Sequence, residues 1–361
     1  MPDVNIDFVG VNGGQGEVAN LLSQSKLDPS AMRPYIGDNG KSYITVFKGG
    51  DAKKLENYKQ VEAPNTNATL RPYEWRQLDE VLLPISESRL NGVQDLISNG
   101  LVYNLGNAMG TTVLEWHDVS DALDAELSMT GISKAENDRQ EFTPHYLPIP
   151  IIHADYQINA RALEASRRMG NPLDVSMAER AVRKVSDKLE KMLFTDTSYQ
   201  FGGGTIFSYT NYTYRNKVTL GTHWDHSGVT GKMIVDDVLA LKQASIEAYH
   251  FGPWMLYIPV GYETILDTDY STSKGNNTIR ERIKAIAGIK DVKVVDTLAA
   301  DNVVLVQMTS DVVRLVRGLG IQNVQWDEQA RFVHKFKVLT IAVPQIRSDA
   351  SNHCGVTHGT F

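Results

Sequence analysis

Residues 153–195, HADYQINARALEASRRMGNPLDVSMAERAVRKVSDKLEKMLFT, hold the longest helical pattern in the chain. The pattern from Ser176 to Leu193 predicts a helix of about 18 residues, roughly 27 Å long at 1.5 Å per residue. Ser176 and Glu179 have the spacing of a capping box, in which two side chains satisfy free amides at a helix start. Gly170 and Pro172 indicate the end of a shorter helix over about 160–169. The stretch therefore predicts two consecutive helices.

The longer helix has three faces when its residues are projected at about 100° each. Its apolar face comprises Ala178, Ala181, Val182, Val185, Leu189, Met192 and Leu193. A basic stripe comprises Arg180, Lys184, Lys188 and Lys191. A mixed stripe between them comprises Glu179, Arg183, Asp187 and Glu190, at spacings suited to weak ion pairs. This pattern indicates one buried face and solvated charges, and it leaves the basic stripe as a candidate contact surface.

The composition is that of an ordinary globular protein, since 42% of the 361 residues are hydrophobic and 22% are charged. This length exceeds what one compact core usually holds and favours two domains. The formal net charge of −7 argues against bulk attraction to nucleic acid. The single cysteine, Cys354, excludes an internal disulfide framework. We expect neither a secretory signal nor a membrane span, because no apolar run has the required length.

Two segments lack a core pattern of their own. The first, residues 1–72, contains candidate strands at 3–11 and 41–47 among polar stretches such as GDNGK and KGGDAKK. The second, residues 111–156, consists of TTVLEWHDVS and HYLPIPIIHADYQI on either side of an acidic connection. Its acidic residues are Glu115, Asp118, Asp121, Asp124, Glu126, Glu136, Asp138 and Glu141. Because such segments bury little apolar surface alone, we expect them to be ordered against a neighbour.

The second half of the chain has a different pattern. Residues 232–326 alternate helices with the strands WMLYIP, VKVVD, VVLVQ and IQNVQW, which is typical of a compact α/β unit. A long β run over 331–343 follows and would return to the first domain. The final residues, SDASNHCGVTHGTF, form a polar stretch that we expect to be a tail. The overall prediction is an α+β fold.

Catalytic motifs are absent from the sequence, so we do not expect an enzyme. The glycines of VNIDFVGVNGGQGEVANLL do not have the G-x-G-x-x-G spacing, which leaves a nucleotide-using enzyme as a remote alternative. Two clusters contain metal-ligand residue types, namely His223, Asp225 and His226, and then His353, Cys354 and His358. Neither cluster has a second ligand pair at defined spacing. We therefore expect no catalytic residue, no metal and no cofactor.

Three stretches resemble the major capsid proteins of tailed phages, whose Hong Kong 97-like fold is shared with encapsulins. LPIPIIHADYQINARALEASRRMGNPLDVSMAERAVRKVSDKLEKMLF resembles the peripheral-domain strand, short helix and spine helix. GPWMLYIPVGYETILDTDYSTSKGNNTIRERIKAI resembles the axial-domain strand, helix, axis-facing loop and next helix. VVLVQMTSDVVRLVRGLGIQNVQWDEQARFVHKFKVLTIAVPQI resembles the closing strands. The resemblance extends over roughly residues 75–347.

The resemblance implies a division into named parts. These are an N-terminal arm (1–72), a peripheral domain (73–110, 153–231 and 327–347) with the spine helix 176–193, an extended loop (111–152), an axial domain (232–326) and a C-terminal tail (348–361). The loop Ser271, Thr272, Ser273, Lys274, Gly275 and Asn276 would surround the axes of hexamers and pentamers. The protein would self-assemble in the host cytoplasm into an icosahedral virion shell around double-stranded DNA. Its inner face would contact the packaged DNA without sequence specificity. Portal, scaffolding and decoration proteins are the further partners implied.

The charge pattern gives a hypothesis for the contact between subunits. The acidic loop tip, Asp118, Asp121, Asp124 and Glu126, would lie over the basic stripe of a neighbouring spine helix. Complementary charges of this kind help to fix the register between subunits. The alternative within the same fold is an encapsulin-type nanocompartment shell that encloses a cargo enzyme.

Overall fold

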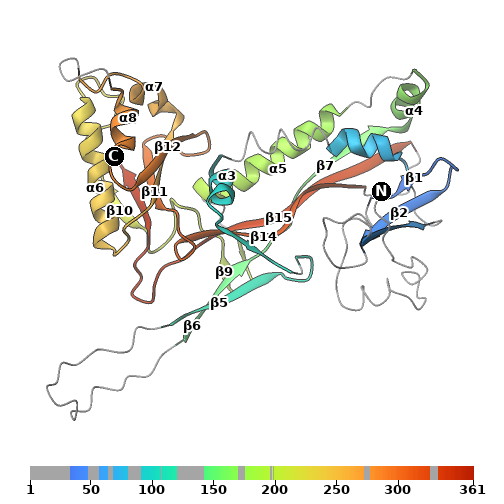
Figure 1. Ribbon diagram of the computed structural model, residues 1–361, viewed down its shortest axis with the longest axis horizontal. Helices are drawn as coiled ribbons and strands as arrows, with labels where there is room; N and C mark the ends of the chain where they lie inside the picture. Colours follow the sequence, from blue (N-terminus) through green and yellow to red (C-terminus); the bar gives the residue numbers. More distant parts are fainter. Residues whose placement is uncertain are drawn as a thin grey trace, which may run out of the picture.

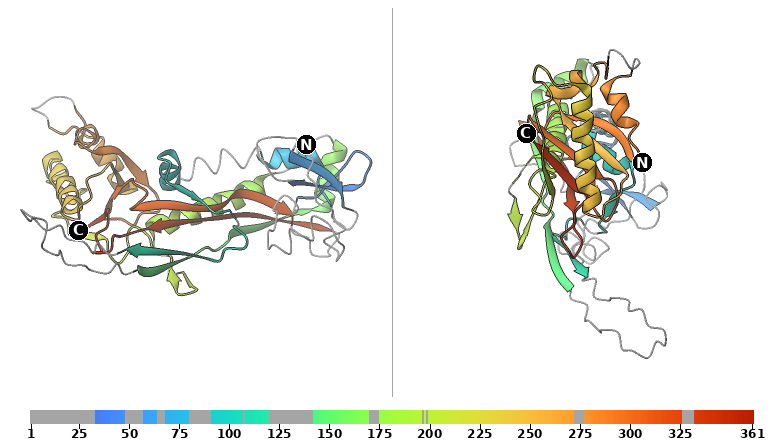
Figure 2. Two further views of the ribbon diagram at one scale, coloured as in Figure 1. Left: turned by 60° about the horizontal axis from the view of Figure 1, so that its bottom comes forward. Right: turned by 90° about the vertical axis from the view of Figure 1, so that its left-hand side faces the viewer.

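Two β-sheets, one long and one broad, organise the computed structural model (Figures 1 and 2). The structure describes residues 33–47, 57–63, 68–79, 91–106, 108–119, 142–169, 175–195, 197, 199–271, 277–325 and 332–361. The molecule is elongated, with the five-stranded sheet at one end and the small sheet containing β1 and β2 at the other.

The long sheet has the strand order β4-β14-β15-β7. Its strands are β4 (Val102–Asn104), β14 (Val313–Gln325), β15 (Val333–Ile346) and β7 (Ile152–Asn159). Strand β15 pairs antiparallel with both β14 and β7. Phe336 is fully buried on β15, where its ring stacks on Tyr156 at 5.3 Å and meets the edge of Trp75 at 5.9 Å. These rings join the sheet to a helical segment over residues 72–79.

The spine helix α5 (Ser176–Phe194) packs on this sheet, and α4 (Ala160–Met169) directly follows β7 (Figure 1). Every residue of the predicted apolar face is buried, so the predicted helix and its orientation are confirmed. The predicted capping box is wrong, because Val175 is the N-cap residue and Ser176 already lies inside the helix. The amide of Glu179 donates to the carbonyl of Val175 at 3.0 Å.

The five-stranded sheet has the order β10-β16-β13-β11-β12. Its strands are β10 (Asn216–Thr219), β16 (Val356–Thr360), β13 (Asn302–Gln307), β11 (Trp254–Pro259) and β12 (Ile289–Val295). Helices α6 (Gly231–Glu247) and α8 (Ile279–Lys284) cover one face with a separate apolar core. The 3-10 turn η4 (Val260–Tyr262) and α7 (Glu263–Leu266) follow β11. The opposite face, including Met255 and Tyr257, packs into the core of the spine region.

Two expectations about this region are wrong. Residues 348–361 are not a polar tail, because β16 lies between β10 and β13 with Val356, Thr357 and His358 buried. Strand β14, expected with the axial unit, instead pairs with β15 in the long sheet, and β10 joins the five-stranded sheet from before residue 232. Strands β10 and β16 pair with each other, and β14 also pairs with β4, across long separations in sequence that a local pattern does not reveal.

The remaining elements project from the two sheets. Strands β5 (Val113–Val119) and β6 (Phe142–Pro148) form a two-stranded hairpin stem that leaves the body, as the right view of Figure 2 shows. The short strands β8 (Gln200–Phe201) and β9 (Gly204–Thr205) lie beside it. At the far end, β1 (Tyr35–Ile36), β2 (Ser42–Phe47) and β3 (Tyr58–Glu62) form a small sheet. Helix α3 (Asn91–Ser98) packs between α5 and the five-stranded sheet.

Candidate functional site

The acidic hairpin is described only as far as its stem. Asp118 lies on β5, and its carboxylate is 2.8 Å from Nε2 of His145 on β6. The His145 ring also stacks on Trp116 at 5.3 Å. Asp121, Asp124 and Glu126 lie outside the described residues. Asp118 is therefore the one predicted acidic contact residue that the structure describes. Its carboxylate is mostly buried and is already bound to His145 of the same hairpin.

The basic stripe lies along the surface of α5. Arg180, Lys184, Lys188 and Lys191 are all exposed. Within the part of the chain that the structure describes, none of the four forms an ion pair. The helical projection predicted this exposure, and the role of the stripe as a contact surface stays a prediction.

The predicted axis loop is described at its base. Ser271 is described, and Thr272, Ser273, Lys274, Gly275 and Asn276 lie outside the described residues. The amide of Tyr270 donates to the carbonyl of Asn277 at 2.9 Å, which closes the loop. Thr278 and Glu281 form a true capping box at the start of α8, so the loop leads directly into a well-defined helix. The base is thus fixed on both sides by backbone and side-chain bonds.

A buried carboxylate, Glu190, joins the spine helix to α3. Its two oxygens accept hydrogen bonds from the amides of Gly92 at 2.7 Å and Val93 at 3.3 Å. Glu190 thereby caps the start of α3, although Gly92 lies 98 residues upstream in sequence. Burial raises the pKa of the Glu190 carboxyl to about 7, against the lowering effect of the two amides. The helical projection had placed Glu190 on a surface stripe, and that prediction is wrong.

Helix α3 is joined to the five-stranded sheet by Asp95. Its carboxylate, which is buried, accepts a hydrogen bond from the hydroxyl of Tyr257 on β11 at 3.2 Å. The Tyr257 ring meets Phe194 of α5 edge-on at 5.0 Å and stacks on Tyr209 at 6.2 Å. Burial raises the pKa of the Asp95 carboxyl. The junction of spine helix, α3 and five-stranded sheet therefore contains two buried carboxyl groups among aromatic rings.

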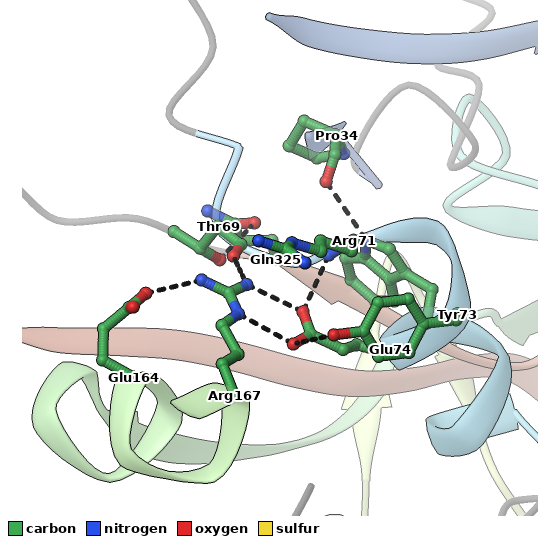
Figure 3. A network of polar contacts seen from close by, with 9 residues as sticks. Pro34, Thr69, Arg71, Tyr73, Glu74, Glu164, Arg167 and Gln325 are labelled. Carbon is green, nitrogen blue, oxygen red and sulfur yellow. Dashed lines mark hydrogen bonds and ion pairs between the residues drawn. The ribbon is translucent and has the colours of Figure 1, made fainter. Parts of the chain in front are cut away.

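A second polar network ties α4 to the segment that follows the small sheet (Figure 3). Arg167 holds both carboxylate oxygens of Glu74 at 2.8 Å, and it also donates to the carbonyl of Thr69 at 2.6 Å. Its remaining amino group binds Glu164 at 2.7 Å. Burial tends to raise the pKa of Glu74, but hydrogen bonds from Arg167 and the Arg71 amide outweigh it and lower that pKa. The bidentate geometry favours a stable attachment.

Three histidines of the two clusters, His223, His353 and His358, have partners outside their own cluster motifs. His223 binds the carboxylate of Asp301 at 3.0 Å, and His353 binds Asp349 at 2.9 Å. His358 is buried between Arg215 and Asn302, and burial lowers its pKa to about 4. No group of three candidate metal ligands occurs within the described ranges. The glycine turn near Gly13 lies outside those ranges. None of the described helices is long and apolar enough to cross a membrane.

Comparison with solved structures identifies the fold. A virus-like particle from Pyrococcus furiosus superposes with a TM-score of 0.56 at 17% identity, over 80% of this chain and 99% of that chain. The capsid of Myoviridae phage XM1 superposes with a TM-score of 0.56 at 10% identity, over 73% of this chain and 90% of that chain. The capsid of a native GTA particle superposes with a TM-score of 0.52 at 14% identity, over 74% of this chain and 89% of that chain. The chain therefore has the Hong Kong 97-like fold, as the sequence resemblance predicted.

The sequence also matches a described family, whose members have no assigned role. The match extends over residues 65–359, which is most of the chain. The chain thus belongs to the family of unknown function DUF6260. No curated protein matches the sequence.

Proposed function

We propose that this protein is a major capsid subunit that self-assembles into the icosahedral shell of a tailed phage. The observation that carries the proposal is the fold, because the superposed virus-like particle and XM1 capsid proteins are covered over 99% and 90% of their length. The role is structural and involves no catalytic step. A shell of this kind would form in the host cytoplasm and become part of the virion.

The shape of the subunit supports an assembly role. The hairpin stem β5–β6 leaves the body and the small sheet lies at the far end of the molecule (Figures 1 and 2). Extended elements of this kind gain stability from packing against other molecules. In the proposed shell, residues 1–72 are the arm and residues 111–152 are the extended loop. The axial domain consists of 232–312 together with β10 and β16, since β14 pairs in the long sheet. The loop 271–276 would face the axes of pentamers and hexamers.

The net charge fits a shell that encloses DNA. A formal charge of −7 would limit adhesion between the inner wall and packaged double-stranded DNA. Packaging would require a portal, and assembly would use scaffolding and decoration proteins as further partners.

The proposed subunit contact pairs the acidic loop tip with the basic stripe of a neighbour. Each exposed pair contributes only about 0–1 kcal/mol, so the effect depends on many copies. Reversing the charge of Arg180 and Lys184 to glutamate should weaken assembly in low salt. The same change at Arg161 and Arg168, which are exposed on α4, is the matched control. Unchanged assembly of the Arg180 and Lys184 variant would rule out this pairing.

An encapsulin-type compartment is the second candidate. It is favoured by the Pyrococcus furiosus particle, because this chain covers 99% of that particle's chain. An encapsulin would assemble without a portal around a cargo enzyme. The two functions thus differ in their contents and in the size of the shell.

Expression of the chain alone, followed by negative-stain electron microscopy and light scattering, tests the proposal. Closed icosahedral particles or rings of five and six subunits are the expected result. Uniform small shells with enclosed protein would favour the encapsulin candidate, and larger shells the phage candidate. A monomer or dimer that persists in crowding agents and high salt would overturn both.

A further inference from the structure

Helix α6 ends with a tyrosine in an unusual conformation. The amide of His250 donates to the carbonyl of Ser245 at 3.0 Å, and the amide of Tyr249 donates to Ile246 at 2.9 Å. This is the Schellman arrangement, in which Tyr249 holds the left-handed position with φ 61°. Glycine is the usual residue there, because it lacks the Cβ that makes this conformation unfavourable. Within the described residues, the ring of this tyrosine contacts His353, while most of its side chain is exposed, and a strained residue of this kind directs attention to a role outside the subunit.

Tyr249 and Phe251, named here the aromatic pair, are the rings presented by this turn. Their side chains are 70% and 67% exposed. The turn is held in place, since the amide of Gly252 donates to Oε1 of Gln307 at 2.9 Å and the Tyr249 ring meets His353 edge-on at 5.1 Å. Aromatic side chains on a fixed backbone lose little conformational entropy on binding and are typical anchors of protein interfaces.

A pocket suited to an aromatic ring lies elsewhere on the same molecule, between α5 and the start of β7. We name it the spine pocket, and it is lined by Pro150, Ile151, Ile152, His153, Lys188, Met192, Thr197, Tyr199 and Ile206. Its volume is about 250 Å³. A dry cavity of about 150 Å³ can hold benzene, so one ring fits. Ile151 and Tyr199 are 45% and 43% exposed, and a subunit's own exposed aromatic pair therefore does not fill its own pocket.

The charges around the two surfaces are opposite. Glu247, two residues before Tyr249, is exposed, and so is Asp311, which acts electrostatically on His250 in the same turn. A third nearby carboxylate, Asp349, is paired with His353. At the pocket, His153 lies 3.4 Å from Asp155, whereas Lys188 of the basic stripe forms no ion pair with any of the described residues. Opposite potentials favour this pairing over contact between two copies of the same surface.

We propose that the aromatic pair of one subunit docks on the spine pocket of a second copy of this chain, with one of its two rings inside the pocket. The inference rests on the proposed shell function and names one of its subunit contacts. Two different patches meet, so the contact is heterologous, and repetition around an axis closes a ring. Arg180 and Lys188 are eight residues apart, about 12 Å along the helix, so the acidic loop tip can still use the other half of the stripe.

Tyr249→Gly is the decisive variant, because folding and assembly should respond in opposite directions. Glycine suits the left-handed position, so the melting temperature of the unassembled subunit should not fall. The subunit concentration needed for half-maximal assembly, measured by light scattering, should rise about tenfold or more. Phe251→Ser should do the same. Leu239→Ser removes another exposed apolar side chain from α6 and should leave assembly unchanged.

Cross-linking tests which surfaces meet. The single native cysteine, Cys354, is fully buried, so the background reaction is low. Tyr249→Cys and Ile151→Cys subunits are co-assembled and treated with a short bismaleimide. A covalent dimer on a denaturing gel is expected only in the mixture. Neither variant alone should give it, nor should Tyr249→Cys mixed with Tyr103→Cys, an exposed site away from the pocket.

The outcomes separate this inference from the function on which it rests. If the native chain forms no particles, the shell function is overturned and this contact with it. A second outcome overturns this contact alone. Native particles form, Tyr249→Gly assembles at the same subunit concentration as the native chain, and the mixture of Tyr249→Cys and Ile151→Cys subunits gives no covalent dimer. Loss of assembly together with a lowered melting temperature in Tyr249→Gly would also overturn it, since the tyrosine would then act in folding.

Discussion

Replacement of Glu190 by glutamine should change how stability depends on pH. Burial places the pKa of this carboxyl at about 7 in the folded chain, against an ordinary value of 4.5. Because the folded state holds its proton more tightly, stability is lost as the pH rises from about 4.5 to about 7. At 1.36 kcal/mol per pH unit, the full effect is about 3 kcal/mol. Asp95 and Asp296 face Glu190 and add to this cost, because their negative charges also raise its pKa.

The assay is urea unfolding of the unassembled subunit at pH 5 and pH 7.5. Glu190→Gln should resemble the native chain at pH 5, since glutamine is neutral and keeps an oxygen for the amide of Gly92. At pH 7.5 it should be more stable than the native chain by about 2–3 kcal/mol. Glu179→Gln, the same change on a partly exposed position of α5, is the control. An equal difference from the native chain at both pH values would refute the buried-carboxyl reasoning.

Further substitutions test the two anchors of α5 and α4. Arg167→Met should lower the free energy of unfolding in guanidinium by about 3–5 kcal/mol, because Glu74 would be a buried charge without its cation. Arg168 is exposed, so Arg168→Met should change the free energy of unfolding by under about 0.5 kcal/mol. Equal losses in both variants would contradict this account of the network. Gly92→Ala should lower stability by about 1–3 kcal/mol despite alanine's better helix propensity, because the added Cβ would lie 2.5 Å from the Phe194 ring. A raised melting temperature would show that α3 is free to move.

The spine helix could be predicted from sequence because its signal is local. Its apolar residues recur at helical spacing, and all seven are buried as predicted. Glu190 could not be placed, because its partner amides at Gly92 and Val93 come from a distant segment. A helical projection of α5 shows which face is apolar. It does not show that Glu190 accepts hydrogen bonds from the first amides of α3.

The C-terminal strand shows a second limit of sequence patterns. VTHGT has little apolar content, yet it occupies an interior position of the five-stranded sheet. His358 is accommodated by Arg215 and Asn302, and a Cβ on Gly359 would lie 2.8 Å from Leu220. The strand is therefore specified by its neighbours, and a pattern of hydrophobic residues does not reveal it.

For the candidate surfaces, the sequence predicted exposure and charge, and the structure added geometry. The basic stripe is exposed as predicted, and Asp118 turned out to be bound to His145. The spine pocket was not anticipated, because its lining comes from three separate segments of the chain. The left-handed Tyr249 was also missed, although a helix ending without glycine before the Gly252-Pro253 pair was a visible signal.

The position of β16 has a consequence for the order of events on the ribosome. Strands β10 and β13 are each paired with β16, and β10 has no other partner in the sheet among the described strands. Residues 356–360 leave the ribosomal tunnel after all of these partners. The five-stranded sheet therefore stays open during synthesis until residues 356–360 have left the tunnel, and β10 has no partner among the described strands of the sheet before then.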